Sequence, residues 1–332
     1  MEIRTPYCLF LGDATDILSI KIAKGIADWR PDLAIGEFGL PECSVTSGIK
    51  ALSIAESAKA GAKTFVVGLA NSGGFIDPNW IPSILLAIEQ GMDIASGLHQ
   101  RLDSIAEIKL KAEEYNVDLI DVRHPAQPFV TGTGTKRAGK RLLTVGTDCS
   151  VGKMYTSLAI EKAMRCQNID TSFVATGQSG IFITGKGVAI DCVISDFIAG
   201  AVEQISPENN PDHWDIVEGQ GSLFHPAFAG VSIGLLHGAQ PDALVLCHAE
   251  QREHMRGIPS RALPSFQETM EANLQAARVT NLQAKFIGIA INTSMLDQAA
   301  ANRVCANYEQ EYNLACVDPV RHGVERLVGK LS

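Results

Sequence analysis

The stretch that decides the fold is LLTVGTDCSVGKMYTSLAIEKAM, residues 142–164. Its apolar start predicts a buried strand at 142–146, and the pattern that follows predicts a helix at 152–166. The turn between them, 146–153, holds two glycines separated by five residues. Such a turn before a helix directs backbone N–H groups and the positive helix end at an anion, and Lys153 adds a point charge. The sequence therefore predicts a phosphate-binding loop; the plainer alternative is a strand–turn–helix with a surface lysine. The residues predicted to bind the cofactor here are Gly146, Thr147, Asp148, Cys149, Ser150, Val151, Gly152, Lys153, Met154 and Tyr155.

Position 154 departs from the usual loop. In nucleotide-hydrolysing proteins a serine or threonine follows the lysine, and its hydroxyl holds the magnesium ion. Met154 offers a thioether, which is a poor ligand for a hard cation. The loop therefore suits phosphates that are held and not cleaved, although Thr156, Asp148 or Glu218 could still recruit magnesium.

The rest of the chain alternates short apolar runs with helical patterns, which is typical of parallel sheets with crossover helices. A stretch at 126–140, rich in glycine, proline and threonine, predicts a linker between two α/β domains, 1–125 and 141–332. Predicted strands of the first domain are 7–13, 33–39, 64–70, 93–99 and 118–123, with helices at 16–28, 45–60, 80–90 and 101–115. Those of the second are 142–146, 171–176, 188–191, 215–218, 243–247 and 286–291, with helices at 152–166, 196–204, 267–279 and 297–312.

Charge and cysteine usage narrow the functional classes. A net charge of -9 over 332 residues argues against a broad nucleic-acid or anionic-membrane surface. The eight cysteines are scattered without a CxxC pair, so no metal site is expected, and scattered thiols suit the reducing cytoplasm. No apolar run approaches the ~20 residues that a membrane span needs. An α/β protein of this size is expected to form a homo-oligomer.

Three motifs carry a resemblance to the P-loop branch of dethiobiotin synthetase. They are GTDCSVGK in the loop, DIVEGQGSLFHP at 215–226 and FIGIAINTS at 286–294. The resemblance implies a P-loop NTPase-like sheet in the second domain, while the alternation of strands and helices predicts a Rossmann-like sheet in the first. It also implies that Glu218, at the end of a strand, belongs to an acidic, glycine-rich second motif and that Asn292 reads an adenine ring.

Longer segments resemble a family long catalogued as a domain of unknown function. They are VGTDCSVGKMYT, the stretches 175–203 and 214–248, and RGIPSRALPSF at 256–266. Members of that family have been described as D-glutamate N-acetyltransferases, which implies acetyl-CoA as co-substrate and an acidic amino acid as acceptor. The alternatives are an ATP- and magnesium-dependent ligase or kinase, and a non-catalytic nucleotide-binding protein.

Acetyl transfer to an amine needs a base, donors for the oxyanion and cations for the acceptor's carboxylates. His225 and Glu218 are the predicted bases, with Lys153 as a third catalytic candidate. Arg252 and Arg256, four residues apart, would share one face of a helix and suit a dicarboxylate, unless they form a solvated basic face. The residues predicted to bind the acceptor are Arg252, Arg256, His248, Gln178 and Ser222.

Overall fold

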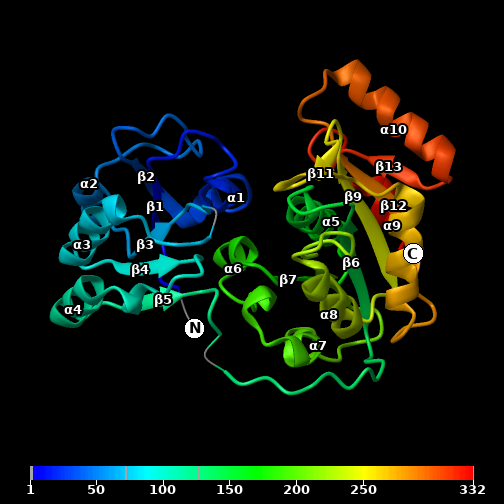
Figure 1. Cartoon of the computed structure of the whole chain (residues 1–332), viewed down its shortest axis with the longest axis horizontal. Helices are drawn as coiled ribbons and strands as arrows, with labels where there is room; N and C mark the ends of the chain where they lie inside the picture. Colours follow the sequence, from blue (N-terminus) through cyan, green and yellow to red (C-terminus); the bar gives the residue numbers. More distant parts are fainter. Residues whose placement is uncertain (1–2, 72, 126, 332) are drawn as a thin grey trace. The chain divides into compact units, whose positions relative to one another are not determined.

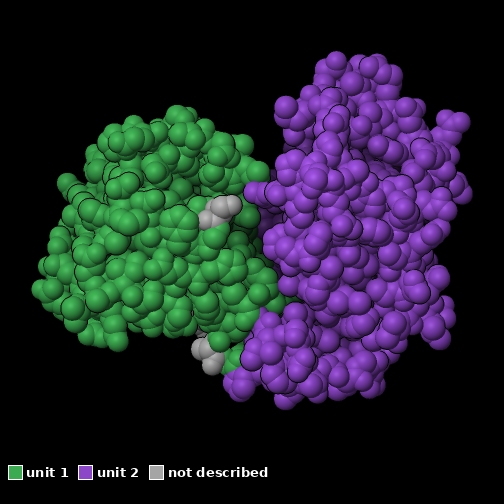
Figure 2. Space-filling model, in the orientation of Figure 1, with its two compact units in different colours: residues 1–127, 177–192 green, residues 128–176, 193–332 purple. Residues whose placement is uncertain are grey.

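The computed structural model describes residues 3–71, 73–125 and 127–331. The chain forms two compact units, and the second half contributes to both (Figure 2). Unit 1 contains 1–127 and 177–192, and unit 2 contains 128–176 and 193–332. Each unit is built on one parallel sheet, so the predicted fold class, two α/β domains, is confirmed. Among the described residues, no helix combines the length and the apolarity that crossing a bilayer requires.

Unit 1 has a five-stranded parallel sheet in the order β2-β1-β3-β4-β5 (Figure 1). The order places the first strand inside the sheet, which is the doubly wound arrangement. The apolar run YCLFLG is buried along its whole length, as a strand covered on both faces must be. The strands are β1 (Tyr7–Gly12), β2 (Ala34–Gly39), β3 (Thr64–Val67), β4 (Asp93–Ser96) and β5 (Leu119–Asp121), and the helices are α1 (Lys21–Trp29), α2 (Ile54–Lys59), α3 (Ile81–Glu89) and α4 (Ala106–Tyr115).

The segment 177–192 belongs to unit 1, although it lies between two strands of unit 2 in the sequence. Its helix α6 (Gln178–Thr184) packs against α1, and the hydroxyl of Tyr7 donates to the carbonyl of Phe182 at 3.4 Å. Arg123 pairs with Asp191 at 3.2 Å. The strand predicted at 188–191 is wrong: the apolar residues are buried, but Ile190–Cys192 forms a short 3-10 turn.

Unit 2 has a six-stranded parallel sheet in the order β13-β12-β9-β6-β8-β7. The strand that precedes the phosphate-binding loop, β6, lies between β9 and β8 and is buried except at its first residue. A central strand gives the loop a rigid base. The strands are β6 (Lys140–Gly146), β7 (Thr171–Val174), β8 (Trp214–Val217), β9 (Ala243–Ala249), β12 (Lys285–Asn292) and β13 (Ala315–Val317).

The helices of unit 2 and one small hairpin flank this sheet (Figure 1). Four elements of unit 2 were not predicted from the sequence: α8 (Ala229–Ala239), α11 (Glu325–Val328), β13 and the hairpin. The α8 sequence AGVSIGLLHGA carries three glycines and no clear polar face, so periodicity gave no signal. Its glycines serve packing, since a Cβ on Gly238 would lie 2.4 Å from the Ala199 carbonyl oxygen of α7. The elements are α5 (Lys153–Cys166), α7 (Ile198–Ile205), α8 (Ala229–Ala239), α9 (Phe266–Ala277), α10 (Gln298–Tyr312), α11 (Glu325–Val328), and the strands β10 (His254–Met255) and β11 (Ile258–Ala262).

The predicted linker, of which residue 126 lies outside the described residues, is irregular from 128 to 139. It is held against unit 2 by specific contacts. The carboxylate of Glu203 accepts from the amides of Thr133 and Gly134 at 3.0 and 3.1 Å. Arg137 donates to the carbonyls of Ser206 and Gly238 at 2.9 and 2.8 Å. The segment 128–139 is therefore an ordered part of unit 2.

Candidate functional site

The loop 146–153, hereafter the phosphate loop, leaves the carboxyl end of β6 and enters α5 at Lys153. Two of its residues lie in the left-handed region, Ser150 at φ 51° and Gly152 at φ 99°. Left-handed turns of this kind bring successive N–H groups to one side, which makes an anion-binding concavity. Gly146 is needed for close packing, because a Cβ there would lie 2.8 Å from the side chain of Val151.

Lys153 is folded back into the phosphate loop. The residue is 6% exposed, and its ammonium donates to the Asp148 carbonyl oxygen at 2.8 Å. Burial lowers the pKa of Lys153, because the charged form has lost its hydration. A phosphate bound in the loop would restore a full counter-charge to this ammonium. The lysine is therefore placed to bind an anion.

Asp148 is fully buried and is paired with two arginines from a distant segment. Its Oδ2 accepts from Arg252 Nη1 at 3.1 Å and from the Arg256 amide at 2.8 Å. Arg252 also donates to the carbonyls of Cys149 and Ser150, at 2.6 and 3.2 Å. The predicted helix carrying both arginines is wrong: Arg252 follows β9, and Arg256 lies in the turn between β10 and β11. The structure nevertheless brings both to the phosphate loop.

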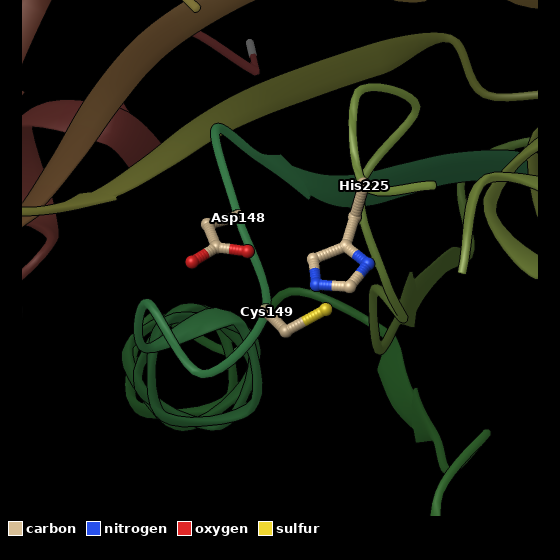
Figure 3. Close-up of side chains that lie close together, drawn as sticks. All are labelled: Asp148, Cys149 and His225. Atoms are coloured by element: carbon tan, nitrogen blue, oxygen red, sulfur yellow. The ribbon is translucent and has the colours of Figure 1, made fainter. Parts of the chain in front are cut away.

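His225 lies beside the same loop, with Asp148 and Cys149 (Figure 3). One ligand atom from each of the three residues lies within 4.8 Å of the others. The His225 Nδ1 accepts from the Ala227 amide at 3.2 Å, so the ring proton is on Nε2, which faces the Arg256 carbonyl at 3.0 Å. The ring also stacks on Phe228, with centroids 4.5 Å apart. In this neutral form both ring nitrogens have backbone partners.

This trio resembles a metal donor set, but its surroundings fit a cation poorly. Asp148 already pairs with Arg252, and burial raises the pKa of the Cys149 thiol, which disfavours the thiolate that a metal would need. The His225 nitrogens are engaged by the backbone. The charges around the loop favour an anion.

The carboxyl end of β8 supplies the second motif. Glu218 is 4% exposed, and its Oε2 accepts from the Thr176 amide at 3.0 Å. The amide of Gly219 donates to the Thr144 hydroxyl at 3.0 Å, which fixes the strand end against β6. Ser222 donates to the Thr147 carbonyl at 3.1 Å. Glu218 and Ser222 therefore lie at the same sheet edge as the phosphate loop.

His248 ends β9 beside the loop. Its Nδ1 lies 2.9 Å from the Thr147 hydroxyl, and its ring meets Phe266 edge-on at 4.9 Å. Burial, with a smaller contribution from Arg252, lowers the pKa of His248 to about 4. The imidazole is thus neutral at neutral pH and brings no charge to an acceptor's carboxylate.

The remaining predicted residues are more dispersed. Gln178 begins α6 in unit 1, where its side chain packs on Gly97. Asn292 is exposed at the end of β12, and its side-chain oxygen accepts from the Ser294 amide at 3.0 Å. Met154 and Tyr155 are half-buried at the start of α5. Thr156 donates its hydroxyl proton to the Gly152 carbonyl at 3.0 Å.

Two threonines organise the site; Thr147 was predicted as part of the phosphate loop, but Thr144 was missed in the sequence. Thr144 is buried within β6 and bonds Ser157 at 3.0 Å as well as Gly219. The Thr147 side chain contacts His248. The available signal was a polar residue inside an otherwise apolar strand, since such a group needs a buried partner.

Comparisons with known proteins agree with this architecture. A domain of unknown function described as DUF1611_C, a P-loop domain, matches residues 128–328, and the Rossmann-like DUF1611_N matches 40–125. A protein of Pseudoalteromonas sp named D-glutamate N-acetyltransferase is 56% identical over 331 residues, covering 100% of both chains. One of the same name from Tritonibacter scottomollicae is 48% identical and covers 99% of both.

A solved structure extends the match to three dimensions. The crystal structure of a DUF1611 family protein from Anabaena variabilis has a TM-score of 0.89 and 29% sequence identity, and the match covers 99% of each chain. The match therefore includes residues of both units. On sequence and on fold, this chain belongs to the DUF1611 family, with a Rossmann-like N-terminal and a P-loop C-terminal domain.

Proposed function

We propose that this chain transfers an acetyl group from acetyl-CoA to the amino group of D-glutamate. The observation that carries the proposal is the full-length identity of 56% and 48% to two relatives that bear the name D-glutamate N-acetyltransferase. The same proposal takes coenzyme A and an acidic amino acid as the small-molecule partners. The proposal also includes a cytoplasmic location and a homo-oligomeric state. Native mass spectrometry can check the oligomeric state.

The phosphate loop suits a coenzyme whose phosphates stay intact. Acetyl transfer breaks a thioester, so nothing in the reaction requires a metal at the pyrophosphate. The loop amides and the buried Lys153 supply donors and charge, while Met154 replaces the hydroxyl that holds magnesium in nucleotide-cleaving relatives. Asn292, at the end of β12, is the proposed adenine contact.

The proposed reacting groups are a base for the acceptor's ammonium and contacts for its carboxylates. Of the two predicted bases we propose Glu218, because both ring nitrogens of His225 already have backbone partners. Gln178, Ser222 and His248 remain proposed acceptor contacts. Pantetheine has about as many chain bonds as four or five extended residues, so it spans roughly 15 Å between the pyrophosphate and the thioester. A base beside the phosphate loop can act only if that arm folds back toward the loop.

The two backbone contacts of the His225 ring lead to a first prediction. We expect His225→Gln to keep kcat within about tenfold, because the side-chain amide can replace one backbone contact and a lost general base costs about 10²–10⁴-fold. Steady-state rates with acetyl-CoA and D-glutamate measure this. His225→Ala, which removes both contacts, serves as the comparison. A hundredfold loss of kcat in both variants, with the KM for acetyl-CoA unchanged, would identify His225 as the base.

A second prediction concerns the first residue after the lysine. Met154→Thr places a hydroxyl where magnesium-binding loops have one, so we expect about a tenfold magnesium-dependent gain in ATP affinity, or about 1.4 kcal/mol. Titration calorimetry with ATP, with and without magnesium, measures it. Met154→Ala removes the thioether without adding a ligand and is the matched control. An equal magnesium effect in both variants would show that position 154 does not select the ligand.

The proposed activity itself is tested with purified protein, acetyl-CoA and D-glutamate in the presence of EDTA. Release of free thiol and a product heavier by one acetyl group are the expected results. L-Glutamate and D-aspartate define acceptor selectivity. Absence of thiol release with every amino acid would refute the proposal. In a separate assay without EDTA, magnesium-dependent phosphate release from ATP would replace it with a ligase or kinase.

A further inference from the structure

The segment 250–257, between β9 and β11, contacts the phosphate loop through the side chain of Arg252. The side of the loop that faces this arginine is called its outer side. Arg252 Nη1 bonds the Asp148 carboxylate and the Cys149 carbonyl, at 3.1 and 2.6 Å. Its Nη2 bonds the Ser150 carbonyl at 3.2 Å. One planar guanidinium therefore joins three consecutive residues of the loop, a geometry that the fixed fork of arginine allows.

These contacts determine the direction of the loop's amides. In a trans peptide the C=O of one residue and the N–H of the next point in opposite directions. Holding the carbonyls of Cys149 and Ser150 on the outer side therefore turns the amides of Ser150 and Val151 to the inner side. Ser150 also adopts a left-handed φ of 51°, which costs a non-glycine residue energy and needs such support.

The negative charge of the buried Asp148 holds Arg252 in this position. Asp148 is 0% exposed, and a buried carboxylate without a cation is strongly unfavourable. Its Oδ1 has no hydrogen-bond partner among the described residues, so the bonds from Arg252 and from the Arg256 amide compensate the whole group. The Arg256 side chain also donates to the Ser150 hydroxyl, and the His225 ring bonds the Arg256 carbonyl. Both arginines therefore bind residues of the phosphate loop.

We propose that Arg252 is a positioning residue that presets the Ser150 and Val151 amides for a pyrophosphate, and that it does not bind the acceptor amino acid. The assignment of this pyrophosphate to coenzyme A rests on the proposed function. The orientation of the loop amides does not depend on it. The length of pantetheine supports the assignment, because a residue at the phosphates is roughly 15 Å of extended chain from the thioester that the acceptor attacks.

The test compares Arg252→Gln with Arg261→Gln, an exposed arginine on the neighbouring strand β11. Arg252→Gln should raise the Kd of CoA and the KM of acetyl-CoA at least tenfold while changing the KM of D-glutamate less than threefold. Arg252→Lys should not restore binding, because an ammonium cannot reproduce the planar fork. Arg261→Gln should match the wild type. A tenfold rise in the KM of D-glutamate with an unchanged Kd for CoA would overturn the proposal.

Two further experiments distinguish the positioning role of Arg252 from an effect on folding and from the identity of the ligand. If Arg252→Gln unfolds because Asp148 loses its cation, the double variant Asp148→Asn/Arg252→Gln removes that charge, and it should still bind CoA at least tenfold more weakly. CoA calorimetry needs no turnover, so it stands even if acetyl transfer fails. Should wild-type protein not bind CoA, inorganic pyrophosphate is titrated in its place, and equal pyrophosphate affinity in wild type and Arg252→Gln would refute the positioning role.

Discussion

Replacing Lys153 with alanine should weaken CoA binding by about a hundredfold, since a charged hydrogen bond to phosphate contributes up to about 3 kcal/mol. The ammonium already lies inside the phosphate loop, 2.8 Å from the Asp148 carbonyl, and the residue is 6% exposed. It therefore needs little rearrangement to meet a phosphate. Titration calorimetry with CoA gives the change in Kd, and acetyl-transfer rates give the matching change in the KM of acetyl-CoA.

The same variant should fold at least as well as the wild type. Burial lowers the pKa of Lys153, so the unfolded chain binds the proton more tightly than the folded chain does. Stability should consequently rise as pH increases from the lowered pKa toward the ordinary lysine value, and Lys153→Ala should lack that rise. Lys63→Ala, an exposed lysine in unit 1, is the control and should change neither quantity. Unchanged CoA affinity in Lys153→Ala would show that the loop is not the phosphate site.

The sequence predicted those parts of the fold whose signal is local. Apolar runs such as LLTV in β6 identified most strands of both sheets, because a strand covered on both faces needs continuous apolar residues. The glycines and the lysine of the phosphate loop are likewise contiguous. In contrast, α8 has no periodic pattern, and the three-residue β13 is too short to stand out.

Contacts between distant residues could not be read from the sequence. The bond from Arg252 to Asp148 joins residues 104 positions apart, and spacing suggested a helix where the chain forms a turn and a hairpin. Similarly, the segment 177–192 lies between two strands of unit 2 in the sequence, yet its helix packs on α1 of unit 1. Tertiary packing decided both, and local propensity is a weak guide in such cases.

Gly219→Ala should be the most destabilising single substitution at the site. A Cβ on Gly219 would lie 1.7 Å from the Thr144 carbonyl oxygen and 2.9 Å from Lys153 Cδ. Because the Thr144 atom is backbone of the central strand, relief requires β8 and β6 to separate and the 3.0 Å bond from the Gly219 amide to Thr144 to break. We expect the free energy of unfolding to fall by about 4 kcal/mol, at the upper end for point mutations.

Thermal unfolding followed by circular dichroism measures this as a drop of roughly 10 °C in Tm. Gly230→Ala is the matched control, since a Cβ at Gly230, inside α8, meets nothing within 4 Å. Alanine there should stabilise the helix by up to about 1 kcal/mol. The two variants add the same methyl group eleven positions apart, so a loss of stability at Gly219 beside a gain at Gly230 would show that the close approach of Thr144 causes the loss. Equal Tm values would mean that β6 and β8 tolerate separation, and the close approach that aligns Glu218 with the phosphate loop would then not be a requirement of the fold.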